Sequence, residues 1–249
     1  MRVVRIIKDC IKKRQKKKRF NRDCKIYSEL NKSSDFRIEN KNVCPIYEDE
    51  NQAGVLDEHY FLQDIWMAKQ VKMNGLNEHF DIGSRIDGFI AHLLSMNIVV
   101  TLIDIRRLVI DIENLKFVQG DATDLISIAD GTLSSLSSLH AIEHFGLGRY
   151  GDDIDPDAWK KVLHSFERVL KKGGFLYLSV PIGEKNHVIY NAHRIFNPHT
   201  IINELADMIL IKFSYIEDYK IYEVEDLDKI EDMIVGKDYL CGCFVFSKI

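Results

Sequence analysis

The chain has 249 residues and a hydrophobic content of 46%, which fits one large α/β domain with room for an appendage. No apolar stretch approaches the roughly 20 residues needed to span a bilayer. The apolar pieces of the basic N-terminus are too short and interrupted to form the core of a signal peptide. We therefore expect a cytoplasmic protein, with at most a peripheral contact at the inner face of the membrane.

The charge is unevenly distributed along the chain. Residues 1–20 contain ten Lys or Arg and one Asp, whereas the remaining residues hold 24 basic and 37 acidic side chains. In a helix, one apolar face of this basic arm would comprise Val3, Ile6, Ile7, Cys10 and Ile11. A solvated tail, a helix resting on an anionic membrane or a partner protein, and a nucleic-acid-binding arm all fit this composition. The acidic remainder argues against general nucleic-acid binding, so we predict no nucleic-acid partner.

The chain is expected to consist of a basic N-terminal arm and lead-in over residues 1–43 and one domain over residues 44–249. The first element predicted in the domain is a helix over 56–72, where acids come first and apolar residues recur at helical spacing. The five cysteines are odd in number and include no C-x-x-C pair. We therefore interpret them as reduced packing residues and expect no bound metal.

A strand, a glycine turn and a helix are predicted between residues 78 and 94. The turn has the spacing G-x-R-x-x-G, formed by Gly83, Arg85 and Gly88. Such a turn brings backbone N–H groups and a helix N-terminus close to a ligand, where a Cβ would obstruct the approach. The motif by itself also fits a plain strand–helix connection.

Two further predicted strands end in acidic residues. The strand over 98–104 ends at Asp104, 21 positions after Gly83, and the strand over 115–119 leads into Asp121. A carboxylate about 20 residues after the glycine turn is the usual partner of ribose hydroxyls. Because parallel strands place their carboxyl ends at one edge, Asp81, Asp104 and Asp121 are expected to face one nucleoside-sized cleft.

The rest of the chain continues the alternation of strands and helices. A serine-rich strand is expected over 132–139 and a helix from Asp155 to Lys172, closed by Gly173 and Gly174. Further elements are expected as a short helix over 121–128, a helix over 197–208, and strands over 175–180, 209–216 and 240–246, with an acidic connection over 217–238. This order predicts an α/β fold with a doubly wound, mostly parallel seven-stranded sheet, whose last two strands form an antiparallel pair.

The segment after the serine-rich strand contains the strongest candidates for acid–base chemistry. His140, Glu143 and His144 have the H-x-x-E-H spacing of inverted zinc proteases, but Gly146 and Gly148 interrupt the long helix that such a site needs. Next to a nucleoside cleft, imidazole and carboxylate side chains suit a general base that removes a hydroxyl proton. A purely structural role for the two histidines stays open.

Two loops at the same edge are expected to shape a substrate pocket. The first spans residues 145–157 and contains Arg149 and Tyr150, and the second spans 181–195 and contains Asn191, His193 and Arg194. An arginine such as Arg194 suits a phosphate or carboxylate. Each of these residues also fits an ordinary surface loop.

The segments DIGSRIDGFIAHLL, TLIDIR, VQGDATDL and RVLKKGGFLYLSVP resemble class I S-adenosylmethionine-dependent methyltransferases, which have a Rossmann-like fold. The segments HYFLQDIWMAK, LHAIEHFGLGRYGDDIDPDAW and NAHRIFNP are similar to a bacterial subfamily described only as a domain of unknown function and associated with surface-polysaccharide biosynthesis. The resemblance covers residues 44–249. It implies S-adenosyl-L-methionine as cofactor and S-adenosyl-L-homocysteine as product.

By position, the resemblance assigns the first cofactor loop to Asp81, Gly83, Ser84, Arg85 and Gly88, the ribose site to Asp104 and Ile105, and the adenine site to Asp121 and Ala122. It places residues 140–144 beside the transferred methyl group. Arg85 departs from the family pattern, which has a small residue there. The Asn/Asp-Pro-Pro-aromatic motif of DNA amino-methylating enzymes does not follow the fourth strand.

The resemblance implies an enzyme that methylates a small acceptor, with a sugar or sugar-phosphate hydroxyl favoured. The alternative is a non-catalytic module that binds the cofactor and is tethered by residues 1–20 to a membrane-associated assembly or a partner protein.

Overall fold

The computed structural model describes residues 2–33, 36–39, 43–45 and 56–249, with side chains from residue 13 onward. The chain divides into two compact units, Met1–Leu56 and Asp57–Ile249. The predicted division at residue 43 stays a prediction.

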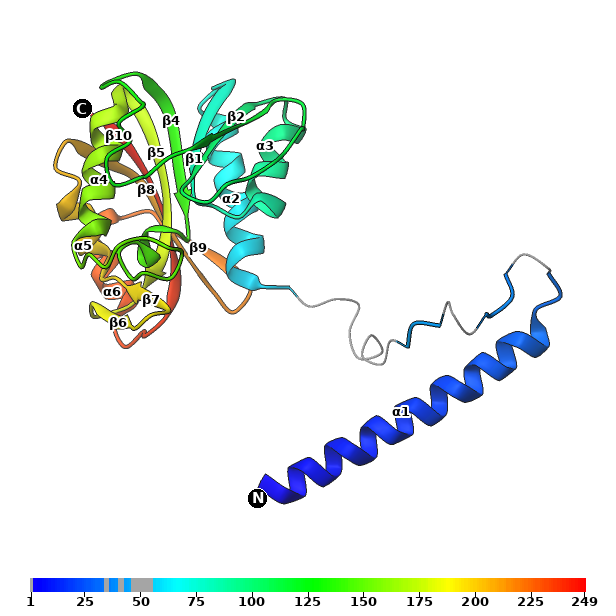
Figure 1. Cartoon of the computed structure of the whole chain (residues 1–249). Helices are drawn as coiled ribbons and strands as arrows, with labels where there is room; N and C mark the ends of the chain where they lie inside the picture. Colours follow the sequence, from blue (N-terminus) through cyan, green and yellow to red (C-terminus); the bar gives the residue numbers. More distant parts are fainter. Residues whose placement is uncertain (1, 34–35, 40–42, 46–55) are drawn as a thin grey trace. The chain divides into compact units, whose positions relative to one another are not determined.

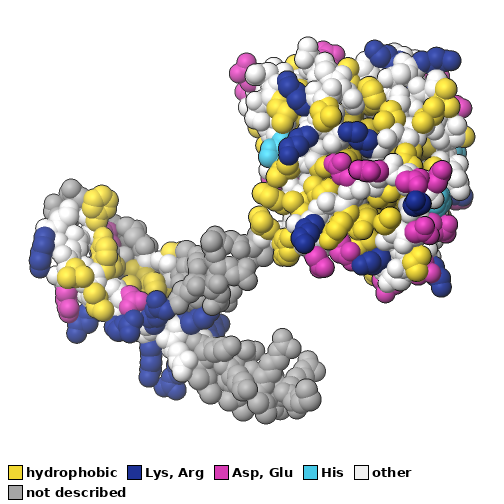
Figure 2. All heavy atoms as spheres, turned by 180° about the vertical axis from the view of Figure 1, so that it is seen from behind, with side chains coloured by type: hydrophobic (Ala, Val, Ile, Leu, Met, Phe, Trp, Pro, Cys, Tyr) yellow, Lys and Arg dark blue, Asp and Glu magenta, His cyan; other side chains and the backbone are white. Residues whose placement is uncertain are grey.

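The first unit contains one long helix, α1 (Arg2–Leu30) (Figure 1). Figure 2 shows Lys and Arg side chains gathered along the described part of this helix, whereas the face of the second unit in view carries both signs of charge. The side chains of the apolar face predicted for residues 3–11 lie outside the described residues. Among the described residues, no helix is both long and apolar enough to cross a membrane.

The second unit is built on an eight-stranded sheet with the order β3-β2-β1-β4-β5-β10-β8-β9. Its strands are β1 (Glu78–Ile82), β2 (Val99–Asp104), β3 (Leu115–Gln119), β4 (Leu133–Leu139), β5 (Leu170–Ile182), β8 (Met208–Glu217), β9 (Lys220–Val224) and β10 (Leu240–Lys248). The strands β1 to β5 pair in parallel, and β10 pairs antiparallel with both β5 and β8. This confirms the predicted doubly wound sheet and its antiparallel C-terminal pair.

The sheet has one strand more than predicted. The strand β9 lies within residues 217–238, which the sequence presented as an acidic connection, and it pairs antiparallel with β8 at the edge. An edge strand exposes one side to water, so charged residues such as Lys220 and Glu223 are compatible with it.

Helices cover both faces of the sheet (Figure 1). One face is covered by α2 (Glu58–Met73), the π-helical turn η2 (Ile86–Ile90) and α3 (Ala91–Ser95), and the other by α4 (Ala158–Val169), α5 (Pro198–Glu204) and α6 (Ile230–Ile234). Short elements complete the unit: the 3₁₀ turns η3 (Ile142–His144) and η4 (Leu227–Lys229), and a hairpin of β6 (His187–Ile189) and β7 (His193–Ile195). Each face has its own apolar core, represented by Phe166 of α4 and Met67 of α2.

Several predicted boundaries were wrong, and one example is the helix expected over 197–208, which ends at Glu204. The helix expected to reach Lys172 ends at Val169, and the glycine pair lies inside β5 instead of closing the helix. Gly173 has a φ of +73°, and a Cβ on Gly174 would come within 3.0 Å of the carbonyl of Leu133 on the neighbouring strand. The glycines therefore allow an irregular strand start against β4. In addition, residues 121–128 form turns instead of the expected short helix.

The serine-rich strand β4 is explained by a buried polar network. His79 of β1 is fully buried, and its two ring nitrogens lie 2.6 Å from Ser135 Oγ and 2.7 Å from Ser137 Oγ. Burial lowers the pKa of His79 to about 3, so the imidazole is neutral. Ser137 also donates to Asp81, and the network therefore fixes the strand end that carries this acid.

Candidate functional site

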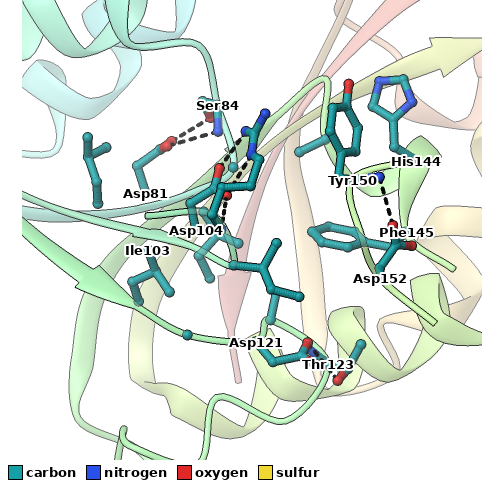
Figure 3. A pocket seen from close by; sticks show the side chains of 18 of the residues that line it. Asp81, Ser84, Ile103, Asp104, Asp121, Thr123, His144, Phe145, Tyr150 and Asp152 are labelled. Atoms are coloured by element: carbon teal, nitrogen blue, oxygen red, sulfur yellow. Dashed lines mark hydrogen bonds and ion pairs between the residues drawn. The ribbon is translucent and has the colours of Figure 1, made fainter. Parts of the chain in front are cut away.

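A cavity of about 950 Å³ lies at the carboxyl ends of β1, β2 and β4. Asp81, Asp104 and Asp121 all line it, as do His140 and His144 on the side of β4. Figure 3 shows the three acids on one side of the space and His144 with Tyr150 across from them. The structure thus brings together residues that are up to 63 positions apart, because parallel strands end at a common edge.

Asp81 stabilises the glycine turn that follows β1. Its carboxylate is fully buried and accepts hydrogen bonds from the backbone N–H and the hydroxyl of Ser84 and from Ser137 Oγ. Burial raises the pKa of Asp81 to about 6, although these three donors oppose the shift. The side chain shapes the turn and presents it to the cavity (Figure 3).

A side chain would be crowded at both glycines of the turn. Gly83 has a φ of +71°, and a Cβ there would lie 3.1 Å from the Cβ of Ala141. Gly88 is not among the residues that line the cavity; a Cβ there would lie 1.9 Å from Asp64 Oδ2. Its glycine is therefore required by the packing of α2 against η2, and its predicted cofactor contact stays a prediction.

Arg85 lines the cavity, and its guanidinium contacts two neighbouring side chains. Its guanidinium lies 4.6 Å from the centre of the Tyr60 ring and 2.8 Å from a carboxylate oxygen of Asp87. Both partners lie near the rim, and half of the Arg85 side chain is exposed to solvent. The arginine therefore leaves the backbone of the turn accessible.

Asp104 is held by an arginine that follows it in the chain. Arg106 donates to Asp104 from its backbone N–H at 2.8 Å, and from Nε and Nη2 at 2.9 and 2.6 Å. Burial by itself would raise the pKa of Asp104, but these donors lower it overall. The same guanidinium lies 4.8 Å from the Tyr150 ring centre, so it links β2 to the loop over residues 145–157.

Asp121 and its neighbours form the third strand end. Asp121 Oδ1 accepts from the backbone N–H and the hydroxyl of Thr123, both at 2.8 Å, which closes a tight turn (Figure 3). Ala122 is buried, and Ile105 lines the cavity with an exposed fraction of 37%. A flat apolar wall beside a carboxylate is a suitable surface for an adenine ring.

The imidazole of His140 is held in one tautomer. Gln63 Nε2 donates to Asp64 Oδ1 at 2.9 Å, which turns Gln63 Oε1 toward His140 Nδ1 at 2.6 Å. Because a carbonyl oxygen only accepts, Nδ1 carries the proton and Nε2 keeps its lone pair. Burial lowers the pKa of His140 to about 3, and its backbone φ of +48° is rare for a residue other than glycine. Such strained residues cluster at functional sites.

Glu143 and His144 form a second pair beside the cavity. His144 Nδ1 donates to the carbonyl of Ala192 at 2.7 Å, so Nε2 again lacks a proton and lies 3.7 Å from Glu143 Oε1. Burial raises the pKa of Glu143 to about 8 and lowers that of His144 to about 4. At neutral pH both groups are therefore mostly uncharged. Glu143 itself is not among the residues that line the cavity.

The predicted substrate residues are not all at this cavity. Tyr150 lines it, but Arg149, Asn191, His193 and Arg194 do not belong to its described lining. Arg194 is buried, and its guanidinium donates to the carbonyls of Glu143, Phe145 and Pro156. In this structure the arginine fixes the loop over 145–157, and its predicted contact with an anionic acceptor stays a prediction.

Several residues at the site had no role in the sequence analysis. The helix α2 contributes Tyr60 to the cavity and Gln63 to His140, and Arg106 and Asp152 organise the rim. Asp152 accepts backbone hydrogen bonds from Gly146, Gly148 and Tyr150, and so shapes the loop. Gln63, Asp64 and Gln70, the polar residues on the otherwise apolar buried face of α2, were the signal available in the sequence.

Two features of the cysteines and histidines concern metal chemistry. The described cysteines, Cys24, Cys44, Cys241 and Cys243, are free thiols, of which only Cys241 and Cys243 are buried. Within the described part of the chain, no group of three His, Cys, Asp or Glu residues is arranged to hold a metal ion. The H-x-x-E-H segment forms a single 3₁₀ turn, η3, instead of the long helix of inverted zinc proteases.

Solved structures with a similar fold include several methyltransferases. A putative sarcosine dimethylglycine methyltransferase from Galdieria sulphuraria has a TM-score of 0.53 and 13% identity, over 74% of this chain and 84% of that one. The 1,6-didemethyltoxoflavin-N1-methyltransferase of Burkholderia thailandensis, with bound 1,6-didemethyltoxoflavin and S-adenosylhomocysteine, has a TM-score of 0.51 and 12% identity, over 76% and 79%. The [4+2]-cyclase SpnF has a TM-score of 0.54 and 12% identity, over 74% and 80%.

These similarities establish the Rossmann-like methyltransferase fold, which hosts at least one other reaction. No curated protein matches the sequence. Residues 108–234, about half of the chain, match one family of proteins. The chain belongs to the family described as "Caenorhabditis protein of unknown function, DUF268".

Proposed function

We propose that the chain binds S-adenosyl-L-methionine and transfers its methyl group to a hydroxyl group of a small acceptor. The observation that carries this proposal is that Asp81, Asp104 and Asp121 line one cavity together with the Gly83 turn and two imidazoles. The fold shared with the methyltransferases supports it.

The residues of the cavity fit the cofactor. Gly83 leaves the backbone free of a Cβ, Asp104 offers two carboxylate oxygens for ribose hydroxyls, and Asp121 with Ala122 offers an acceptor and an apolar surface for adenine. The cavity volume of about 950 Å³ suits a nucleoside together with a small acceptor. Bound S-adenosyl-L-methionine supplies an electrophilic methyl group on a sulfonium, so the protein has to provide position and a proton acceptor.

His140 is the proposed proton acceptor for the hydroxyl. Its Nε2 keeps a lone pair, is buried and has no hydrogen-bond partner, whereas His144 Nε2 already faces Glu143. The pKa of Glu143, raised to about 8 by burial, leaves this acid protonated near neutral pH, so it is available as a hydrogen-bond donor and not as a base.

Isothermal titration calorimetry with S-adenosyl-L-homocysteine tests the cofactor site. Replacing Asp104 with Ala should weaken binding about ten- to a hundredfold, because charge-assisted hydrogen bonds to the ribose are lost. Asp207→Ala, which removes an exposed carboxylate, is the matched control. Unchanged affinity in the Asp104 variant would remove its ribose role, and no binding by the unaltered chain would contradict the proposal.

The finer assignments rest on the sequence resemblance. A sugar or sugar-phosphate hydroxyl as acceptor, O-methylation in surface-polysaccharide biosynthesis and a cytoplasmic location are proposals in this sense. So is peripheral contact of the basic arm with a membrane or a partner protein. Binding of S-adenosyl-L-homocysteine without methyl release from S-adenosyl-L-methionine on any acceptor would favour the non-catalytic module instead.

A further inference from the structure

Six ring side chains from separate parts of the chain form a continuous cluster next to the cavity. We call it the ring cluster, and its members are His59, Tyr60, His140, His144, His193 and Tyr239. The ring centroid of His140 lies 5.2 Å from that of Tyr60 and 6.1 Å from that of His59. The rings of His59 and Tyr239 are stacked, with centroids 5.4 Å apart. The cluster continues from Tyr239 to His193, with ring centroids 5.6 Å apart, and from His193 to His144, with centroids 6.5 Å apart.

The ring cluster opens into the cofactor cavity. Tyr60, His140 and His144 belong both to the cluster and to the lining of the cavity. An acceptor held against the other members would therefore meet a cofactor bound at the strand ends. The two sites would share one wall, as direct transfer between bound molecules requires.

Three buried polar atoms in this region have no hydrogen-bond partner. They are His140 Nε2, Glu143 Oε2 and His193 Nε2. The exposed fraction is 8% for His140 and 1% for Glu143, so water does not reach these residues freely. A buried polar atom without a partner costs about 1–3 kcal/mol, and native proteins rarely leave one without a reason. Three such atoms in one cluster indicate a ligand with several polar groups.

The surroundings of these atoms favour an uncharged ligand. Burial lowers the pKa of His59, His140, His144 and His193, so the imidazoles are neutral, and Glu143 is mostly protonated near neutral pH. Three guanidinium groups lie nearby, and each already has a partner. Arg85, 4.6 Å from the centre of the Tyr60 ring, lies 2.8 Å from a carboxylate oxygen of Asp87. Arg194 donates to three backbone carbonyls, and Arg149 donates to the carbonyl of Ala192 at 3.2 Å and lies 5.2 Å from the Tyr150 ring centre.

We propose that the ring cluster, together with Glu143, is the acceptor site, and that the acceptor is an uncharged ring compound bearing several hydroxyl groups, such as a cyclic polyol or an unphosphorylated sugar. The hydroxyls satisfy the three orphaned atoms, and the C–H faces of such a ring pack on aromatic side chains. This inference rests on the proposed methyl transfer for its meaning. The inference goes beyond the proposed function in two respects: it excludes phosphorylated acceptors, and it names His59, His193 and Tyr239 as contacts of the acceptor.

Saturation-transfer difference NMR on the full chain tests the site with defined probes. The neutral probes are myo-inositol, methyl α-D-glucopyranoside and methyl α-D-galactopyranoside, and the charged probes are glucose 6-phosphate and galactose 1-phosphate. We expect signals from a neutral probe, with binding at least about tenfold weaker in His59→Ala and Tyr239→Ala. The matched controls are His164→Ala and Tyr219→Ala, whose side chains are largely exposed and lie outside the cluster.

Each result decides the question. The inference is overturned if no neutral probe gives a signal, if the signals persist in both cluster variants, or if the phosphorylated sugars bind equally well. Circular dichroism verifies that each variant is folded, and the conservative Tyr239→Phe and His59→Gln variants replace any that is not. Calorimetry with S-adenosyl-L-homocysteine on the same samples reports separately on the cofactor. If S-adenosyl-L-homocysteine does not bind, the proposed function is contradicted. The NMR signals of the probes, recorded without cofactor, still show whether the ring cluster binds a neutral polyhydroxylated ring.

Discussion

Replacing Glu143 with Gln should change how the stability of the protein depends on pH. Glu143 is 1% exposed, and burial raises its pKa from an ordinary 4.5 to about 8. Between these two values the folded state keeps a proton that the unfolded state releases. Stability therefore falls as pH rises through this window, and the loss is complete only above the folded pKa of about 8. Glutamine does not ionise, so the variant lacks this contribution.

The expected magnitude follows from the size of the shift. One pKa unit corresponds to 1.36 kcal/mol, so the two units between pH 5.5 and 7.5 lower the unfolding free energy of the unaltered chain by about 3 kcal/mol relative to Glu143→Gln. Counted from below pH 4.5, where Glu143 is protonated in both states, the total loss after full ionisation above pH 8 is about 5 kcal/mol.

Urea unfolding at pH 5.5, 6.5, 7.5 and 8.5, followed by circular dichroism, measures this difference. Glu225→Gln, at an exposed position, serves as the control and should run parallel to the unaltered chain. If the difference in unfolding free energy between the unaltered chain and Glu143→Gln is constant over the whole pH range, Glu143 is not protonated in the folded state near neutral pH. This result would also remove the hydrogen-bond donor that the acceptor site requires.

Three further substitutions test the groups that prepare the site. Arg106→Ala frees the carboxylate of Asp104 from its present donors, and calorimetry should show severalfold tighter binding of S-adenosyl-L-homocysteine; weaker binding would mean that the arginine contacts the cofactor. Gln63→Leu removes the acceptor from His140 Nδ1, so ¹⁵N NMR should show a mixture of ring tautomers, and methyl release should fall about tenfold or more; a single unchanged tautomer would contradict the orienting role. Gly88→Ala places a Cβ 1.9 Å from a carboxylate oxygen of α2, so thermal unfolding should show a Tm lower by several degrees, and an unchanged Tm would show that the helix shifts freely.

The sequence determined the sheet and the cofactor edge. Apolar runs alternating with helical patterns are enough to predict a doubly wound sheet, and β1, β2 and β3 formed where expected. Asp81, Asp104 and Asp121 could be assigned to one cavity because each lies within two residues of the end of its strand. Parallel strands end at a common edge, so position along the strand already fixes position in space.

Tertiary structure decided the element boundaries that depend on neighbouring strands. The pattern before β5 reads as a helix end, but pairing with β4 extends the strand back to Leu170. The strand β9 pairs with the edge of β8, and its strand-forming residues Ile221, Tyr222 and Val224 lie in an acidic segment that masked the pattern. Local propensity is weaker than the backbone pairing that a neighbouring strand supplies.

The acceptor side of the site was likewise decided only by the fold. Gln63 and His140 are 77 residues apart, and His59, His193 and Tyr239 come from α2, β7 and the segment before β10. The buried position of Arg194, where it donates to the carbonyls of Glu143, Phe145 and Pro156, was also decided by the fold. Strand periodicity fixes which residues reach a sheet edge, whereas contacts between helices and loops depend on packing distances and angles that no sequence spacing encodes.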